Sequence, residues 1–510
     1  MSSARPTESQ EIETDAEETP APSDSPEESA VLEQDVNSGS TDARPLWARI
    51  LGRPPVEVYV LGAISALLHF AFLSSPRAIV FDETYFRTYG LEYKAHSYYF
   101  DLHPPLGKLL IGLWGAITGV GAQAAQTTDP GVGLRTFPAL CGTLLVIVVY
   151  YFIRRLSGSR RMATLGAGML MLDNALLVTS RFTLMDSLLL LVGMGAVTLA
   201  LASYSRTGWA YWATIVGAAF LGGMSITIKA TGLSALALVG LLWLIDVVRR
   251  RRNWKPVLGQ LSLLVVIPVM VYLLTFAIHF ALLTKTGPGD VYMPKDFQAT
   301  LKGNPNYDPN AHLSFVKKFK ELNHAMGYYE IQADKLTHPD SSKWYTWPIG
   351  RRSVYLYYEQ EANGKSKYIY EIPNVAVWWG ALLGAAVVFV GIALRPGRFA
   401  RWKWPLAFLF LGWMANWLPF AFIHRPMFIY HYFFALMFSI GFVATGLGAL
   451  TGWSDDGDKP FTFSTRRSAS IYWGILGVAL ILFLYFGPTT FGIPLTPQGL
   501  TDRMWLPTWR

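Results

Sequence analysis

Cysteine is almost missing from this sequence. Cys141 is alone among 510 residues, so a disulfide bond within the chain is excluded. The nine histidines have no metal-ligand spacing, and no glycine-rich loop of the nucleotide-binding type occurs. We therefore expect no metal site, no cofactor and no nucleotide-binding domain.

Charge is also scarce. Charged residues make up 15% of the chain, whereas soluble domains carry about 25%. Hydrophobic residues reach 52%, and apolar stretches of about 20 residues recur, each long enough to cross a hydrocarbon core of roughly 30 Å. This scarcity excludes a string of soluble domains and predicts an all-α integral membrane protein.

The charges that are present divide unevenly. Residues 1–45 carry twelve acidic side chains against two arginines, so we expect a disordered acidic tail and no signal peptide. Residues 46–510 form the membrane domain and are basic. Because most of their Arg and Lys flank apolar stretches, contact with membrane lipids is expected and a nucleic-acid partner is not.

Eleven membrane spans are expected. They lie near residues 57–76, 137–156, 162–180, 183–204, 208–227, 230–248, 257–284, 374–394, 404–423, 430–452 and 470–488. With the N-terminus in the cytoplasm, the densest basic clusters, at 154–161, 249–255 and 395–403, all fall on the inner side. This arrangement puts the C-terminus outside.

One apolar segment does not fit as a span. Residues 106–121 are short and rich in glycine, and counting them as a span would move the basic clusters to the wrong sides. We therefore expect a helix that lies on the outer membrane face. Two outer loops are then long, 77–136 and 285–373, and the second has room only for a small subdomain.

The first outer loop opens with two carboxylates, Asp82 and Glu83, just beyond the first span. Partial desolvation at a membrane surface can raise the basicity of a carboxylate, which suits a general base acting on a hydroxyl group. The alternative is that both residues merely cap or solvate a helix end.

A second motif in this loop is DLHPPLGKLL at 101–110. Its two prolines fix the direction of the backbone and begin a helix. His103 and Lys108 would then place hydrogen-bond donors at the level of a lipid phosphate. The alternative is a turn whose basic residues only touch lipid headgroups.

Further charged residues lie at span boundaries or inside spans. Such a charge costs at least about 2.5 kcal/mol, so it usually faces a partner or a polar cavity. The set is Arg135, Arg181, Asp186, Lys229 and His279. The alternative to a direct role is ion pairing between helices, for example of Arg181 with Asp186 or Asp173.

Two aromatic-rich blocks lie on the outer side later in the chain. In IHRPMFIYHYFF, Arg425 stands before a proline at a helix start, which suits a lipid phosphate, and His431 follows it. In SKWYTWPIG, a candidate platform for a sugar or peptide consists of Trp344, Tyr345 and Trp347. Anchoring at the membrane interface is the alternative for these aromatic residues.

Taken together, the motifs resemble those of the protein O-mannosyltransferases, multi-spanning enzymes with the GT-C glycosyltransferase fold. The matching blocks follow the family's order from about residue 57 to the C-terminus. They are FDETYF at 81–86, DLHPPLGKLL at 101–110, RTFPALCGTL at 135–144, DNALLVTSRFTLMD at 173–186, SITIKATGL at 225–233, FAIHFALLTKTGPGD at 276–290, SKWYTWP at 342–348 and RPMFIYHYFFAL at 425–436. The resemblance implies a GT-C fold with about eleven transmembrane helices.

The resemblance also implies roles for the matched residues. Asp82 would be the general base, Glu83 would support it or contact the acceptor, and Arg135 would be needed for activity. Contacts to the donor phosphate or to the scaffold of the site would come from His103, Lys108, Arg181, Asp186, Lys229, Arg425 and His431.

Members of this family transfer mannose from a β-linked lipid phosphate to Ser/Thr hydroxyls and form an α-linked product, which implies inversion. The loop at 285–373 has no room for the β-trefoil module of eukaryotic members, and Ala230 and Thr231 stand where many members have Trp after the lysine. The chain is thus similar to bacterial relatives. The resemblance implies polyprenyl-phosphate-mannose as co-substrate and exported proteins as acceptors. The basic clusters put the site on the outer side of the plasma membrane, where chains emerge extended, and this motivates the hypothesis that the enzyme works beside the secretion translocon.

Two other functions fit parts of the pattern. Another GT-C enzyme could move a different lipid-linked sugar to a lipid or glycan, although the SKWYTWP and YHYFFAL blocks favour protein mannosylation. A transporter or flippase would show repeated halves and broken helices near the bilayer midplane, and no sequence repeat is visible.

Overall fold

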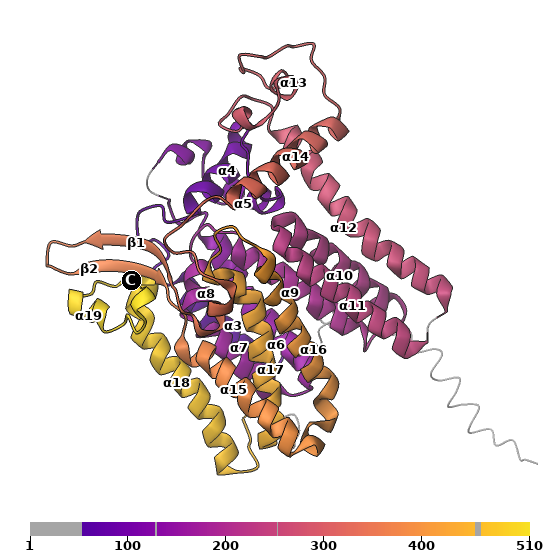
Figure 1. Ribbon diagram of the computed structural model, residues 1–510, viewed down its shortest axis with the longest axis vertical. Helices are drawn as coiled ribbons and strands as arrows, with labels where there is room; N and C mark the ends of the chain where they lie inside the picture. The colour runs from indigo at the N-terminus through magenta and orange to yellow at the C-terminus, as the bar shows by residue number, and fades with distance from the viewer. Residues whose placement is uncertain (1–53, 128–129, 252, 454–460, 510) are drawn as a thin grey trace, which may run out of the picture. The chain divides into compact units, whose positions relative to one another are not determined.

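The structure is a computed structural model that describes residues 54–127, 130–251, 253–453 and 461–509. The acidic tail expected at 1–45 lies outside the described residues. α-Helices make up most of what is described (Figure 1). In chain order they are α3 (Val56–Phe70), α4 (Glu83–Ala95), α5 (Leu106–Ile117), α6 (Thr136–Ser157), α7 (Arg160–Met171), α8 (Asn174–Thr179), α9 (Asp186–Ser203), α10 (Gly208–Ile228), α11 (Leu233–Arg250), α12 (Trp254–Leu282), α13 (Lys295–Gln298), α14 (Phe315–Ala333), α15 (Val375–Leu394), α16 (Lys403–Ala415), α17 (Phe433–Thr451), α18 (Arg466–Phe491) and α19 (Pro497–Thr501).

Nine helical segments within the described residues are long and apolar enough to cross a membrane. They correspond to nine of the eleven spans expected from the sequence. The first expected span, 57–76, is the 15-residue helix α3, because the chain leaves the helical conformation at Ala71. The all-α membrane fold is therefore confirmed, while the number of spans stays a prediction.

The span expected at 162–180 is wrong as a single helix, because Leu172 and Asp173 separate α7 from α8. The side chain of Asp173 caps α8 by accepting the N–H of Leu176 at 2.9 Å. Asn374, at the start of α15, donates its amide to the carbonyl of Leu172 at 2.7 Å. A buried backbone group left over by the break is thus satisfied, as a membrane interior requires.

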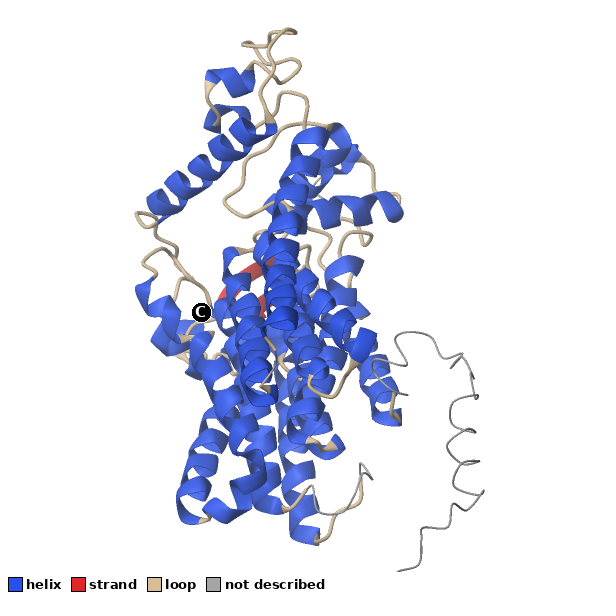
Figure 2. Cartoon of the chain, turned by 90° about the vertical axis from the view of Figure 1, so that its right-hand side faces the viewer, coloured by secondary structure: helices blue, strands red, loops and turns tan. Residues whose placement is uncertain are grey.

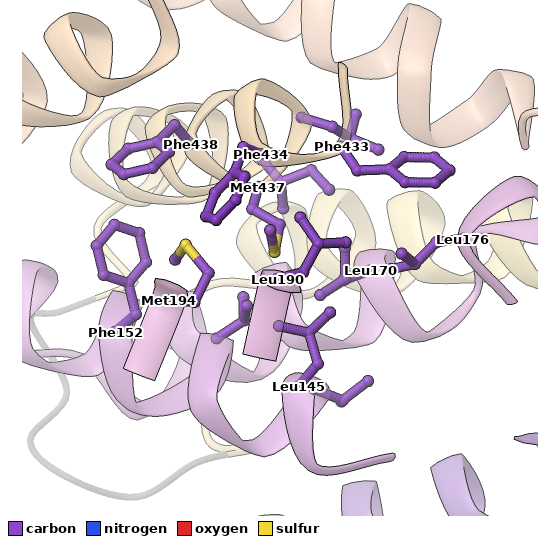
Figure 3. Packing of buried hydrophobic residues seen from close by; sticks show 14 of the residues in the cluster. Leu145, Phe152, Leu170, Leu176, Leu190, Met194, Phe433, Phe434, Met437 and Phe438 are labelled. Carbon is purple, nitrogen blue, oxygen red and sulfur yellow. The ribbon is translucent and has the colours of Figure 1, made fainter. Parts of the chain in front are cut away.

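Among the long apolar helices of the described residues, α17 is the most buried, and it packs against α7, α15 and α16. Figure 3 shows Phe434 and Phe438 of α17 meeting Phe152 of α6 and Met194 of α9. Gly193 of α9 makes this approach possible, since an added Cβ there would lie 2.3 Å from the ring of Phe434. Small residues at contacts of this kind are how membrane helices obtain close packing.

A second cluster gathers α4, α5, α13 and α14 at the top of Figures 1 and 2. Its buried residues include Tyr93 of α4, Phe276 of α12, Phe297 of α13 and Leu322 of α14. The 12-residue helix α5 packs against α4 and α10. At 1.5 Å per residue it is about 18 Å long, too short to cross a bilayer, which fits the surface helix expected at 106–121.

The loop expected at 285–373 folds into small elements. After α13 and α14, the only strands of the described residues, β1 (Val354–Gln360) and β2 (Ser366–Glu371), form an antiparallel ribbon with an irregular register at Tyr355 and Tyr357. β2 packs against α8 and α18. The loop therefore forms one wall of the region around α8 instead of a large separate module.

Candidate active site

A cavity of about 700 Å³ lies between α14 and the ends of the membrane helices. This volume is typical of ligand-binding sites. Six of the residues singled out from the sequence line it: Asp82, His103, Asp186, Lys229, Arg425 and His431. Motifs spread over most of the chain thus converge on one cavity.

The cavity extends along the helices as an apolar surface. On α9, Leu189 and Leu190 lie one turn further along than Asp186, and on α11, Ala237 lies one turn beyond Leu233. The polar groups are at the helix ends and the hydrocarbon groups are further in. A ligand with a polar head and a hydrocarbon tail fits this distribution.

Asp82 is placed at the cavity by a strained turn before α4. The preceding Phe81 has a φ of +48°, a left-handed conformation that is costly for a bulky side chain. The ring of Phe81 is held edge-on against Phe428 at 5.9 Å. Packing of this ring therefore helps to fix the direction of the next side chain.

The carboxylate of Asp82 has no hydrogen bond or ion pair to any residue in the described part of the chain. Burial raises the pKa of Asp82 to about 6. Lys229 opposes this rise, whereas the carboxylates of Asp186 and Asp101 reinforce it. An unpartnered carboxylate of raised basicity is what a general base requires.

Glu83 does not line the cavity and is fully buried. Its carboxylate accepts two bonds from Arg135, at 2.9 and 2.7 Å, and further bonds from the N–H and hydroxyl of Thr183 at 3.1 and 3.0 Å. It also accepts the N–H of Val80 at 3.2 Å. We call Glu83, Arg135 and Thr183 the clamp. With all its acceptor positions used, Glu83 fits the first of its two expected roles, support of Asp82, and not contact with an acceptor.

Arg135 likewise works behind the site. Its remaining N–H groups donate to the carbonyls of Pro76 and Ala78 at 2.8 and 2.7 Å. It therefore fixes the loop that leads to Asp82. The contacts of Arg135 fit a positioning role and not contact with a ligand in the cavity.

Lys229, at the end of α10, and Asp186, at the start of α9, form a hydrogen-bonded ion pair of 2.8 Å. The ammonium also lies 5.7 Å from the ring centre of Phe86 and 5.5 Å from that of Tyr430. Two aromatic faces and one carboxylate thus hold this cation in place. Both side chains are only 11% exposed, so the pair is a fixed part of the wall.

Arg425 is the second cation of the cavity, and its partner is Glu330 of α14, with 2.8 Å between Nε and Oε1. Arg425 Nε has no hydrogen-bond partner among the described residues, so its N–H does not point at that oxygen although the two atoms are close. The two side chains are 22% and 45% exposed. This pair is looser than that of Lys229 and Asp186.

His103 lines the cavity, and burial lowers its pKa to about 3, so its imidazole is neutral. Lys108 lies behind it and uses its three N–H groups on Asp101 and on the carbonyls of His103 and Pro104, at 2.5, 2.6 and 2.9 Å. Of the two roles expected for Lys108, these contacts favour a part of the scaffold over a contact to the donor phosphate. Lys108 fixes the backbone that presents His103.

Arg181 does not pair with Asp186 or Asp173, and it does not line the cavity. It donates to the carbonyls of Thr490 and Phe72 at 2.8 Å each. These groups lie at the C-terminal ends of α18 and α3, where carbonyls lack helical partners. Arg181 therefore belongs to the scaffold and joins two helix ends.

The aromatic platform expected from SKWYTWPIG is divided. Tyr345 is 60% exposed, whereas Trp347 is buried and stacks on His431 with ring centres 5.8 Å apart. Trp344 packs against Trp417 at 5.7 Å. Trp347 thus supports a residue of the cavity wall, and of the three only Tyr345 is well exposed.

The residues that sequence reasoning missed are on α14 and beside α16. Asn323, Glu330 and Asn416 all line the cavity. On α14, Asn323, Met326, Gly327 and Glu330 are spaced as one helical face. The spacing of three and four residues within a polar loop could have indicated a helix with one face at the site.

No group of three His, Cys, Asp or Glu side chains that could hold a metal ion occurs in the part of the chain that the structure describes. The absence of a metal requirement stays a prediction. The charged groups of the cavity are two cation–carboxylate pairs and the lone carboxylate of Asp82. Chemically, the arrangement can accept a proton at Asp82 and bind an anion beside two cations.

Two family models match the chain. The model described as dolichyl-phosphate-mannose-protein mannosyltransferase matches residues 59–284, and that of the C-terminal four-transmembrane region of protein-O-mannosyltransferase matches residues 315–509. Together they span most of the membrane domain and every residue of the cavity.

Relatives were found among curated proteins. Protein O-mannosyltransferase 1 of Drosophila pseudoobscura pseudoobscura is 37% identical over 48% of this chain and 29% of its own length. Dolichyl-phosphate-mannose–protein mannosyltransferase 3 of Saccharomyces cerevisiae is 33% identical over 49% of this chain and 35% of its own length. The matches thus cover less than half the length of these relatives.

Among solved structures, a chain of the S. cerevisiae protein O-mannosyltransferase Pmt1-Pmt2 complex bound to the sugar donor resembles this fold with a TM-score of 0.78. The likeness covers 89% of this chain and 92% of the other at 17% identity. It confirms the expected GT-C fold. With nine apolar helices in the described residues, the chain is a multi-pass membrane protein.

Proposed function

The chain belongs to the dolichyl-phosphate-mannose–protein mannosyltransferase family, and from that premise we propose that it transfers mannose from a polyprenyl-phosphate donor to Ser/Thr hydroxyls of proteins. The observation that carries this proposal is the single unpaired carboxylate, Asp82, in a cavity that also holds two cations and an apolar extension. Each part of the reaction has a matching group.

Asp82 takes the proton of the acceptor hydroxyl. The hydroxyl oxygen then attacks the anomeric carbon of mannose, and the bond from that carbon to the phosphate oxygen breaks. One in-line displacement inverts the configuration, from β in the donor to α in the product. Since a lipid phosphate is a good leaving group, no general acid is needed, and the nearby cations Lys229 and Arg425 stabilise the departing charge.

The hydrocarbon of the donor occupies the apolar extension beside Leu189, Leu190 and Ala237. The site faces the outer side of the plasma membrane, which the distribution of basic clusters at 154–161, 249–255 and 395–403 supports. Acceptors that reach this side beside the secretion translocon are still extended, so their hydroxyls are accessible. The loop at 285–373 has no room for a β-trefoil module, which supports a bacterial type of polyprenyl donor.

The test uses the full chain in nanodiscs with polyprenyl-phosphate carrying labelled mannose and a Ser/Thr/Pro-rich peptide. We expect transfer to the peptide, an α-linked product by NMR, and loss of transfer in Asp82→Asn. The matched control is Asp334→Asn, which removes an exposed carboxylate outside the cavity. Binding of the donor without any transfer to the peptide would overturn the protein acceptor and favour a lipid or glycan acceptor instead.

A further inference from the structure

Arg425 and Glu330 differ from the other ion pair of the cavity in where they are attached. Lys229 and Asp186 stand at the ends of α10 and α9, two membrane helices packed along their length. Glu330 lies on α14, outside the bundle, and Arg425 lies in the connection between α16 and α17. One pair is built into the wall, and the other joins two surface elements.

α14 has one side packed on the aromatic cluster and another side at the cavity. Its middle is anchored, because Leu322 and Ala325 are buried in the aromatic cluster with Phe276, and Asn323 accepts the hydroxyl of Tyr272 at 3.0 Å. Nearer its end, the side chain of Glu330 is 45% exposed. The contact with Arg425 therefore joins the cavity-facing side of α14 to the opposite side of the cavity.

We propose that Glu330 is a positioning residue that holds Arg425 while the site is empty and releases it to the phosphate of the donor. This inference rests on the proposed use of a phosphate-linked donor. The exchange is balanced in charge, because a phosphodiester carries one negative charge, as a carboxylate does. It is also feasible in geometry, because Arg425 keeps an unaligned Nε–H and both partners line the cavity.

Glu330 has a second effect after transfer. The product lipid phosphate is a monoester and carries between one and two negative charges near neutral pH, so it binds Arg425 more strongly than the donor does. Return of Glu330 to Arg425 competes with the product and promotes its release. Glu330 therefore tunes affinity for both lipids, and most for the product.

The decisive variant is Glu330→Gln, which keeps the size of the side chain and removes its charge. We expect the donor KM to fall about two- to fivefold, the size of a part-exposed ion pair, and the inhibition constant of polyprenyl phosphate to fall by more. We also expect kcat to fall, because product leaves more slowly. A residue with only a structural role would not lower KM and kcat together.

Two controls isolate the exchange. Asp334→Asn removes a carboxylate four residues along, at the end of the same helix, and should leave KM and the inhibition constant unchanged. In an Arg425→Gln background, Glu330→Gln should give no further gain, since the partner is already gone. A gain that persists in that background would overturn the exchange and leave only a general charge effect.

The failure of this inference can be told apart from failure of the proposed function. If wild type transfers mannose and Glu330→Gln behaves as Asp334→Asn does, the exchange is wrong and the function stands. If wild type neither binds polyprenyl phosphate nor transfers mannose, the proposed function fails and the exchange fails with it.

Discussion

Asp82 and Glu83 are neighbours in the chain, but their carboxylates have opposite surroundings: Asp82 faces the cavity and Glu83 belongs to the clamp. Glu83 is surrounded by donors from α6 and from the loop before α9, and none of its acceptor positions is left for a ligand. Asp82 has a cavity in front of it and no donor. The clamp fixes the loop that carries Asp82, so Asp82 needs no partner of its own to hold it in place. The clamp should therefore decide whether the protein folds, and the cavity whether it reacts.

The largest expected effect comes from the cavity. Asp82→Asn should reduce transfer by about 10²- to 10⁴-fold, the usual contribution of a general base, with little change in melting temperature. Initial rates of mannose transfer and a thermal melt in detergent measure the two quantities. A variant that melts normally and still transfers at near wild-type rate would place the base elsewhere.

Substitutions in the clamp should mainly lower the stability of the protein. Glu83→Gln leaves the buried charge of Arg135 uncompensated and should lower the free energy of unfolding by roughly 3–5 kcal/mol. Glu359→Gln, which breaks an exposed pair with Lys367, is the matched control and should change little. The comparison fails if Glu83→Gln melts as wild type does but loses transfer as Asp82→Asn does.

A smaller effect concerns pH. Asp82 works as a base only when it is ionised, and its pKa is raised from 3.8 to about 6. The kcat/KM for transfer should therefore fall about tenfold for each pH unit below 6 and level off above it. Asp186→Asn removes a carboxylate that raises the pKa of Asp82 and frees a cation that lowers it, so the limb should move to lower pH. If the acidic side of the pH–rate profile does not move in Asp186→Asn, a group other than Asp82 is titrating.

The smallest effect tests the exposed part of the expected aromatic platform. Tyr345→Ala should raise the acceptor KM by no more than about fivefold, as for loss of one aromatic contact, and leave the donor KM unchanged. Tyr358→Ala, a tyrosine of similar exposure on β1, serves as the control. Equal behaviour of the two variants would show that Tyr345 is an ordinary surface residue.

The sequence predicts the spans well because hydropathy and basic flanks report the surrounding solvent, and nine long helices lie where they were expected. It also leads to Asp82, Asp186, Lys229 and Arg425, since charged residues at helix ends of a membrane protein usually face a cavity. Residue type and position alone do not separate Asp82 from Glu83, and only the family resemblance assigns the base to Asp82. The burial of Glu83 is decided by Arg135 and Thr183, which are far away in the sequence.

Two other features of the structure were not predicted from the sequence. The pairing of Arg425 with Glu330 joins a span boundary to a polar loop, where a glutamate needs no explanation. The break between α7 and α8 was signalled by Asp173 and Asn174, since both residue types favour helix caps. The apolar residues around them outweigh that signal in any hydropathy window.

The break between α7 and α8 also sets an order of events during synthesis. The carbonyl of Leu172 is satisfied by Asn374, and the carboxylate of Asp173 accepts the indole N–H of Trp378 at 2.7 Å. Both partners are made some 200 residues after the groups that they satisfy. Until the ribosome has made α15, the carbonyl of Leu172 and the Oδ2 atom of Asp173 must use water or another temporary partner. The first half of the protein therefore cannot reach its final state in the bilayer before the second half arrives.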